Sequence, residues 1–188
     1  MPPTTGTEST AMVYGNIRTS LAKIDQVSKK GEQYVDLYLV HAPRAGPHSR
    51  VNNWEAMVKA RKEGWVRDIG VSNLFVPYCF PLAGITADQC IYSGIRHLKE
   101  LPGPTPTVNQ IELHPWCQQR EIVSYCQEHN IAVQAYCPIL KADPKKLGDP
   151  VIARIGKKYD KDGAQILIRW SLQKGYVLCF RSHEWSID

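Results

Sequence analysis

Apolar residues recur along the chain with two spacings, and each spacing predicts one kind of element. The first predicted helix has four apolar residues at helical spacing: Val13, Ile17, Leu21 and Ile24. Ser9 or Thr10 stands just before them as a candidate cap. A continuous β-rich apolar run then covers residues 34–40, and it predicts a buried strand.

The alternation of helix and strand continues to the end of the chain. Further helices are predicted between Asn52-Asn53 and Gly64, over 118–129, from Asp149-Pro150 onward, and from Asp162 to just before Gly175. Further strands are predicted over 65–71, 107–113, 131–136 and 176–180. About five strands separated by helices favour an α/β fold with parallel pairing. The pattern leaves both an open doubly wound sheet and a closed barrel as alternatives.

Composition and charge narrow the class of protein. Of the 188 residues, 43% are hydrophobic and 22% charged, as in a single globular domain. The net charge of +5 comes from scattered basic residues, which favour a solvated surface or contacts to a phosphate-bearing cofactor over nucleic-acid binding. The six cysteines form no CxxC pair, so no metal site is expected. No leader follows Met1, and the apolar stretch 74–85 is interrupted by prolines. We therefore expect a cytoplasmic protein with no membrane contact.

Polar residues stand where the predicted strands end or inside them: His41, Ser72, Asn73, Gln110 and Tyr136. Each has a structural interpretation: a histidine that forms local hydrogen bonds, a Ser-Asn helix cap, a core tyrosine. Gln110 is harder to explain in this way, because a buried amide needs partners. Parallel α/β folds bind ligands at the carboxyl ends of their strands, and together these groups suit a carboxamide and a flat ring. The sequence contains no GxGxxG motif or P-loop.

Four segments resemble consecutive strands of the aldo-keto reductases. They are the fourth strand, Tyr-Val-Asp-Leu-Tyr-Leu-Val-His at 34–41; the fifth, Arg-Asp-Ile-Gly-Val-Ser-Asn at 67–73; the sixth, Val-Asn-Gln-Ile-Glu-Leu-His-Pro at 108–115; and the seventh, Ala-Tyr-Cys-Pro-Ile at 135–139. Within the family, the sequence most resembles fungal or yeast-type reductases. The resemblance implies a partial (β/α)8 TIM barrel, roughly the fourth to eighth strands with their helices, as one incomplete domain over residues 1–188.

The resemblance also implies the roles of particular residues. His41 matches the histidine that hydrogen-bonds the substrate carbonyl, and Ser72, Asn73 and Gln110 match the residues that hold the nicotinamide carboxamide. Tyr136 matches the tyrosine that stacks on the nicotinamide ring. The remaining cofactor-binding candidates are Cys137, Ile139 and Leu140 near the pyrophosphate, with Arg181 and Ser182 in register with a Lys-Ser pair that precedes the 2′-phosphate site. The implied cofactor is NADPH, with NADH as an alternative, and the implied substrate is a small carbonyl compound.

The chain departs from the family pattern in three places. The aspartate, tyrosine and lysine of the catalytic tetrad have no counterpart, and Tyr14 and Lys23 lie on a predicted helix. Residues 75–93 match nothing in the family, and we expect an insertion or a disordered excursion, from either a surface loop or a translated intron. After Val177 the family's usual sequence is replaced.

Three functions follow from this reading. The first is an NADPH-dependent reductase of aldehydes or ketones, impaired in this chain by the missing tetrad residues. The others are a non-catalytic nicotinamide-binding protein and an unproductive fragment. A monomer is expected from the family, and exposed sheet edges offer a route to self-association.

Overall fold

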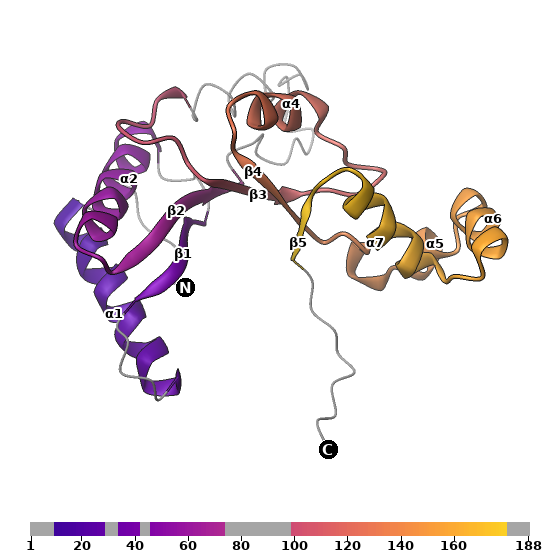
Figure 1. The fold of residues 1–188 in the computed structure, drawn as a ribbon, viewed down its shortest axis with the longest axis horizontal. Coiled ribbons are helices and arrows are strands. Elements are labelled where there is room, and N and C mark those ends of the chain that lie inside the picture. Colours follow the sequence, from indigo (N-terminus) through magenta and orange to yellow (C-terminus); the bar gives the residue numbers. More distant parts are fainter. Residues whose placement is uncertain (1–9, 29–33, 42–45, 74–98, 180–188) are drawn as a thin grey trace.

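Five parallel strands form the centre of the part of the chain that the structure describes. The structure, a computed structural model, describes residues 10–28, 34–41, 46–73 and 99–179. The strands are β1 (Val35–Val40), β2 (Val66–Ser72), β3 (Val108–Glu112), β4 (Ala132–Tyr136) and β5 (Val177–Cys179). Each pairs in parallel with the next one along the chain. Such a sequential order, with no reversal, decides between the two alternatives left by the sequence. The strands follow one another around a curved sheet, as in part of a (β/α)8 barrel (Figure 1).

In the described ranges, one helix precedes β1, others connect β1 to β2, β3 to β4 and β4 to β5, and they cover the sheet. The long ones are α1 (Thr10–Ser28), α2 (Gly46–Lys62), α4 (Arg120–Glu128), α6 (Pro150–Tyr159) and α7 (Gly163–Gln173), with the short η1 (Leu140–Ala142) and α5 (Pro144–Leu147) between β4 and α6. Helix α2 packs on β1 and β2, α4 on β4, and α7 on β5, while α1 lies against α2 (Figure 1). None of the helices in these described ranges has the length and apolar character needed to span a bilayer.

The core lies between the sheet and its helices. Trp54 and Met57 of α2 and Ile69 of β2 are almost completely buried there. Gly70 of β2 allows a close approach at this point, because a Cβ atom would lie 2.6 Å from the carbonyl oxygen of Val108 on β3. The strand carboxyl ends are thereby held side by side.

Local sequence signals set most of the element boundaries. The Asp149 side chain accepts a hydrogen bond of 2.9 Å from the Val151 amide at the start of α6. Asp162 and Gln165 form a reciprocal capping box at the start of α7. Gly175 ends that helix with φ of +76°, where glycine is favoured. The cap at Asp149, the helix start at Asp162 and the position of Gly175 were predicted, and the structure confirms them, whereas the pairing of Asp162 with Gln165 was not predicted.

One local prediction was wrong, and two short elements were missed. Helix α2 begins at Gly46, so Asn52 and Asn53 lie inside it rather than capping it. The Asn53 amide reaches back to Ser49 Oγ at 3.5 Å, and the nearby apolar residues pack on the sheet, which outweighs the weak helix propensity of asparagine. The short elements η1 and α5 were not predicted. The expected excursion at 75–93, the Ser9 cap, and Arg181 and Ser182 lie outside the described residues.

Candidate functional site

The structure brings four of the predicted residues together at the carboxyl ends of neighbouring strands. Ser72 ends β2, Gln110 is the middle residue of β3, and Tyr136 ends β4, while Asn73 follows Ser72 directly. Asn73 adopts a left-handed backbone conformation with φ of 55°, which asparagine tolerates better than most residues. Its backbone N–H donates a hydrogen bond of 2.9 Å to the backbone carbonyl oxygen of Gln110. The backbone therefore turns at the edge of the sheet formed by Ser72, Asn73, Gln110 and Tyr136, here called the rim. This turn fixes the asparagine over β3.

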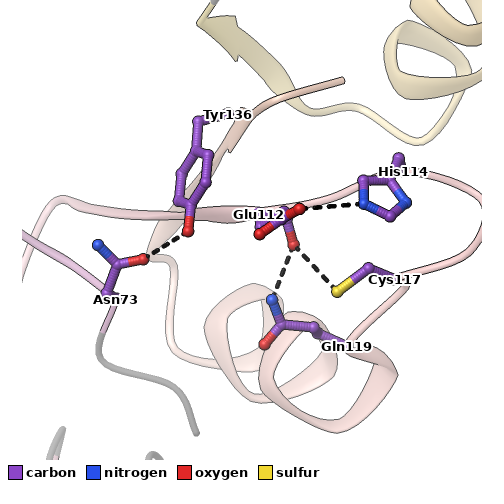
Figure 2. A network of polar contacts seen from close by, with 6 residues as sticks. All are labelled: Asn73, Glu112, His114, Cys117, Gln119 and Tyr136. Carbon is purple, nitrogen blue, oxygen red and sulfur yellow. Dashed lines mark hydrogen bonds and ion pairs between the residues drawn. The ribbon is translucent and has the colours of Figure 1, made fainter. Parts of the chain in front are cut away.

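Asn73 is the centre of a hydrogen-bond network that spans the rim. Its Nδ2 donates to the carbonyl oxygen of His41 at 3.0 Å and to Ser72 Oγ at 3.1 Å. Its Oδ1 accepts from the hydroxyl of Tyr136 at 2.9 Å (Figure 2). The side-chain amide thus joins the ends of β1, β2 and β4. Because both of its ends are engaged, its orientation is fixed.

Ser72 and Gln110 form the second half of the rim. The buried Ser72 hydroxyl donates to the Gln110 carbonyl oxygen at 3.0 Å. The Gln110 side chain is half-buried, and its Nε2 donates to Oε1 of Gln134 on β4 at 2.8 Å. Gln134 was not predicted as a site residue. Among the described residues, the side-chain amide of Gln110 keeps one N–H and its side-chain oxygen Oε1 available for a ligand.

His41 directly follows β1 and is connected to the rim by its backbone. Its carbonyl oxygen accepts the hydrogen bond from Asn73, and its side chain is exposed. Within the described part of the chain, no hydrogen bond reaches the imidazole ring. The ring is therefore open to solvent beside the asparagine, and the local hydrogen bond expected from a structural histidine is made by the main chain instead.

The segment after β4 has an unusual backbone. Cys137 has φ of 51°, and Leu140, Lys141 and Ala142 follow with φ values of 51°, 55° and 60°. Such left-handed conformations are costly for non-glycine residues and cluster at functional sites. The Leu140 amide donates to the Cys137 carbonyl oxygen at 3.0 Å, and Ile139 between them is half-buried. Burial and the nearby Glu112 carboxylate both raise the pKa of the Cys137 thiol.

A second polar network, not predicted from the sequence as part of a site, lies at the strand position paired with Tyr136. Its centre is Glu112, the last residue of β3 (Figure 2). The Glu112 carboxylate lies 3.3 Å from Nε2 of the buried His114. The Glu112 backbone carbonyl accepts from Gln119 Nε2 at 2.7 Å and from Cys117 Sγ at 3.7 Å. Burial lowers the pKa of His114 although Glu112 acts in the opposite direction.

One signal in the sequence could have revealed Glu112. It lies two residues after Gln110 on the same strand, so both side chains point to the same face of the sheet.

The four cysteines within the described ranges are free thiols, Cys117, Cys126, Cys137 and Cys179. Those same ranges contain no group of three His, Cys, Asp or Glu side chains that could hold a metal ion.

The donor set of the rim fits a nicotinamide. A carboxamide offers one acceptor oxygen and two donor hydrogens, and the Gln110 amide has the complementary pair of groups on its free edge. The half-buried ring of Tyr136 supplies an aromatic surface two residues after Gln134, the strand partner of Gln110. Ser72 and Asn73 add a hydroxyl and an amide within the same network. The fold and this rim define a barrel-type α/β protein with a candidate ligand site at the strand carboxyl ends.

Comparison with known proteins identifies the family. The pattern of the Aldo/keto reductase family matches residues 5–182, and the chain belongs to that family. An uncharacterized oxidoreductase of Schizosaccharomyces pombe is 40% identical over 153 residues, which cover 79% of this chain and 47% of the relative. This fungal relative is consistent with the resemblance of the sequence to fungal or yeast-type reductases.

Solved structures support the same assignment. The crystal structure of an aldo/keto reductase from Brucella melitensis matches with a TM-score of 0.74 and 32% identity, over 96% of this chain and 60% of that protein. A mutant of the protein Gox0644, solved in complex with NADPH, matches with a TM-score of 0.70 and 31% identity, over 90% of this chain and 55% of that one. The predicted partial barrel is thus confirmed. The chain spans about half the length of the curated relatives that it matches.

Proposed function

We propose that this chain forms the nicotinamide-holding side of an NADPH-dependent aldo-keto reductase, which reduces an aldehyde or ketone to an alcohol. The observation that carries the proposal is the bond between Tyr136 and Asn73, which closes a rim of carboxamide-binding groups around an aromatic ring. A solved relative in complex with NADPH supports the choice of nicotinamide cofactor. NADH is the alternative.

Each rim residue has a defined task in this proposal. Gln110, Ser72 and Asn73 bind the carboxamide of the cofactor and fix the rotation of its ring. Tyr136 stacks on one face of the ring and excludes water from that side. The bound cofactor supplies a hydride to the substrate carbonyl carbon. Pyrophosphate contacts are assigned to Cys137, Ile139 and Leu140, and contacts to the 2′-phosphate side to Arg181 and Ser182.

His41 is the proposed substrate-binding group. Its exposed imidazole stands beside Asn73, where it can donate a hydrogen bond to a carbonyl oxygen and orient the carbonyl toward the ring. A hydrogen bond to the developing alkoxide helps, but proton transfer needs a positioned acid. The family's tyrosine, lysine and aspartate have no counterpart in these 188 residues. We therefore infer that the chain by itself binds the cofactor better than it turns over a substrate.

A second candidate function is nicotinamide binding without catalysis. It is favoured by the contrast between the rim, where Asn73 is held on both sides, and His41, whose ring has no hydrogen bond among the described residues.

Self-association is a separate question. Strands β1 and β5 are the edges of the sheet as described, and such edges can pair with another chain.

The test is a fluorescence titration of NADPH with the purified chain and two matched variants. Asn73→Asp preserves shape but removes the amide N–H groups that contact His41 and Ser72. We expect its dissociation constant to rise by about tenfold or more. Asn16→Asp makes the same charge change on the exposed side of α1 and should leave binding unchanged. Equal binding by both variants, or no binding by the unmodified chain, would contradict the proposal.

A further inference from the structure

Glu112 lies on the face of β3 that carries the proposed nicotinamide site. Asn109 and Ile111 are completely buried beneath the strand, whereas Gln110 and Glu112 are half-buried on its other face. In the register of the sheet, Gln110 is paired with Gln134 and Glu112 with Tyr136 of β4. The carboxylate therefore occupies the position next to the tyrosine and two residues from the glutamine amide.

His114, one partner of this carboxylate, adds no positive charge at neutral pH. His114, 3.3 Å away, is buried, and burial lowers the pKa of its imidazole, so the ring stays neutral. Burial raises the pKa of the Cys117 and Cys137 thiols, and the Glu112 carboxylate raises both further, so its field reaches both sides of the strand end.

We propose that Glu112 tunes the redox state of the bound cofactor by electrostatics. The nicotinamide ring is positively charged when oxidised and neutral when reduced. A carboxylate on the same face therefore stabilises the oxidised form selectively and favours hydride donation by the reduced form. The inference rests on the proposed function, because it requires the nicotinamide to lie at this rim. It assigns Glu112 no contact with the substrate and no proton transfer.

The size of the effect can be bounded from the spacing along a strand. Two residues of a strand span about 6–7 Å. A unit charge at that distance changes the ratio of the two cofactor affinities by about threefold in water and about fiftyfold at the edge of a protein. Glu112 is between these limits, since its side chain is 22% exposed. We therefore expect a change of roughly tenfold in this ratio.

The measurement is the ratio of the dissociation constants for NADP+ and NADPH, obtained by equilibrium titration of the full chain. Glu112→Gln preserves a hydrogen-bond acceptor for His114 but removes the charge. Its binding of NADP+ should weaken roughly tenfold more than its binding of NADPH. Lys141 and Lys146, which act on Cys137 and His114, are present in both proteins and cancel in the comparison.

Two further variants test whether a change in this ratio comes from the charge of Glu112. Gln134→Glu places a second carboxylate on the same face and should move the ratio the opposite way, toward tighter NADP+ binding, even if Glu112→Gln does not fold. Glu121→Gln removes a charge from the exposed side of α4 and should leave the ratio within twofold.

The outcomes separate the inference from the function on which it rests. Binding of both nucleotides with a ratio that neither Glu112→Gln nor Gln134→Glu changes would overturn the inference and leave the proposed function standing. Failure of the unmodified chain to bind either nucleotide overturns the proposed function, and the inference with it. Opposite shifts in the two variants support both.

Discussion

The hydroxyl of Tyr136 donates a hydrogen bond of 2.9 Å to Oδ1 of Asn73 and so joins the end of β4 to the end of β2 across β3. The two residues are 63 positions apart in the sequence. One bond therefore closes the rim at a point where the strands themselves are not neighbours. It also fixes which end of the asparagine amide faces the Ser72 hydroxyl, because Nδ2 must then point away from Tyr136.

Removal of this bond should affect both stability and cofactor binding. In Tyr136→Phe, the half-buried Oδ1 of Asn73 loses its partner, and we expect the free energy of unfolding to fall by about 1 kcal/mol. NADPH affinity should fall several-fold, since the amide is free to turn. Urea denaturation and fluorescence titration measure the two effects. Tyr159→Phe, at a residue whose side chain is 59% exposed, is the control and should change neither quantity.

The close approach of β2 and β3 makes Gly70 intolerant of substitution. In Gly70→Ala, the added Cβ would lie 2.6 Å from the Val108 carbonyl oxygen and 2.7 Å from Leu39 Cδ2. We expect destabilisation of about 1–3 kcal/mol, because the strands must separate. Gly15→Ala is the matched change on helix α1, where nothing lies within 4 Å of the new atom. It should be neutral or stabilising by up to about 1 kcal/mol, and equal denaturation midpoints for the two variants would contradict the packing argument.

His114 should make stability depend on pH in a defined direction. Burial lowers the pKa of its imidazole below the ordinary value of 6.5, which applies in the unfolded chain. Below that value the unfolded chain takes up the proton more readily than the folded one. Stability from this group is therefore fully present above pH 6.5 and declines as the pH falls toward the lowered pKa.

The check is thermal unfolding across this pH range, with a variant that does not titrate. His114→Gln should show a smaller loss of stability between pH 7 and pH 5 than the unmodified chain. The two curves should run parallel above pH 7, where His114 is neutral in both the folded and the unfolded state. A steeper acid loss in the variant would show that the imidazole gains rather than loses affinity for protons on folding.

The strand ends could be predicted from the sequence because their signals are local. The apolar runs placed the strands, and the polar residues directly after them, such as Asn73 and Tyr136, had to meet at one edge of a parallel sheet. The family resemblance then assigned their roles. The pairing of Gln110 with Gln134 was not predicted. It depends on the register between two strands, and no local pattern states that register.

The backbone of residues 140–142 was beyond prediction for a different reason. Left-handed conformations are usually signalled by glycine or asparagine, and this segment reads Leu140, Lys141 and Ala142. The His114–Glu112 pair was also missed as part of a site. Its residues contributed to the family resemblance, but the burial that sets the charge of the pair is a property of the folded chain.

The last prediction concerns turnover by the 188-residue chain. We expect the purified chain to reduce a reactive aromatic aldehyde with NADPH at least about 10²-fold more slowly than aldo-keto reductases that carry the whole tetrad, because a positioned general acid is worth about 10²–10⁴-fold. Tyr14 does not replace that acid. It lies on α1, away from the strand ends, and its hydroxyl donates to Glu63, a hydrogen bond that raises the pKa of the tyrosine and makes it a weaker acid.

Two variants make the test of turnover specific. NADPH absorbance is followed for the unmodified chain, for His41→Ala and for Tyr14→Phe. Any residual rate should fall in His41→Ala, because the exposed imidazole is the proposed group that orients the carbonyl. Tyr14→Phe should leave it unchanged, since that side chain belongs to the contact between α1 and α2. Turnover comparable to that of reductases with the whole tetrad, lost in Tyr14→Phe, would mean that α1 moves to the rim in solution and that this tyrosine protonates the product.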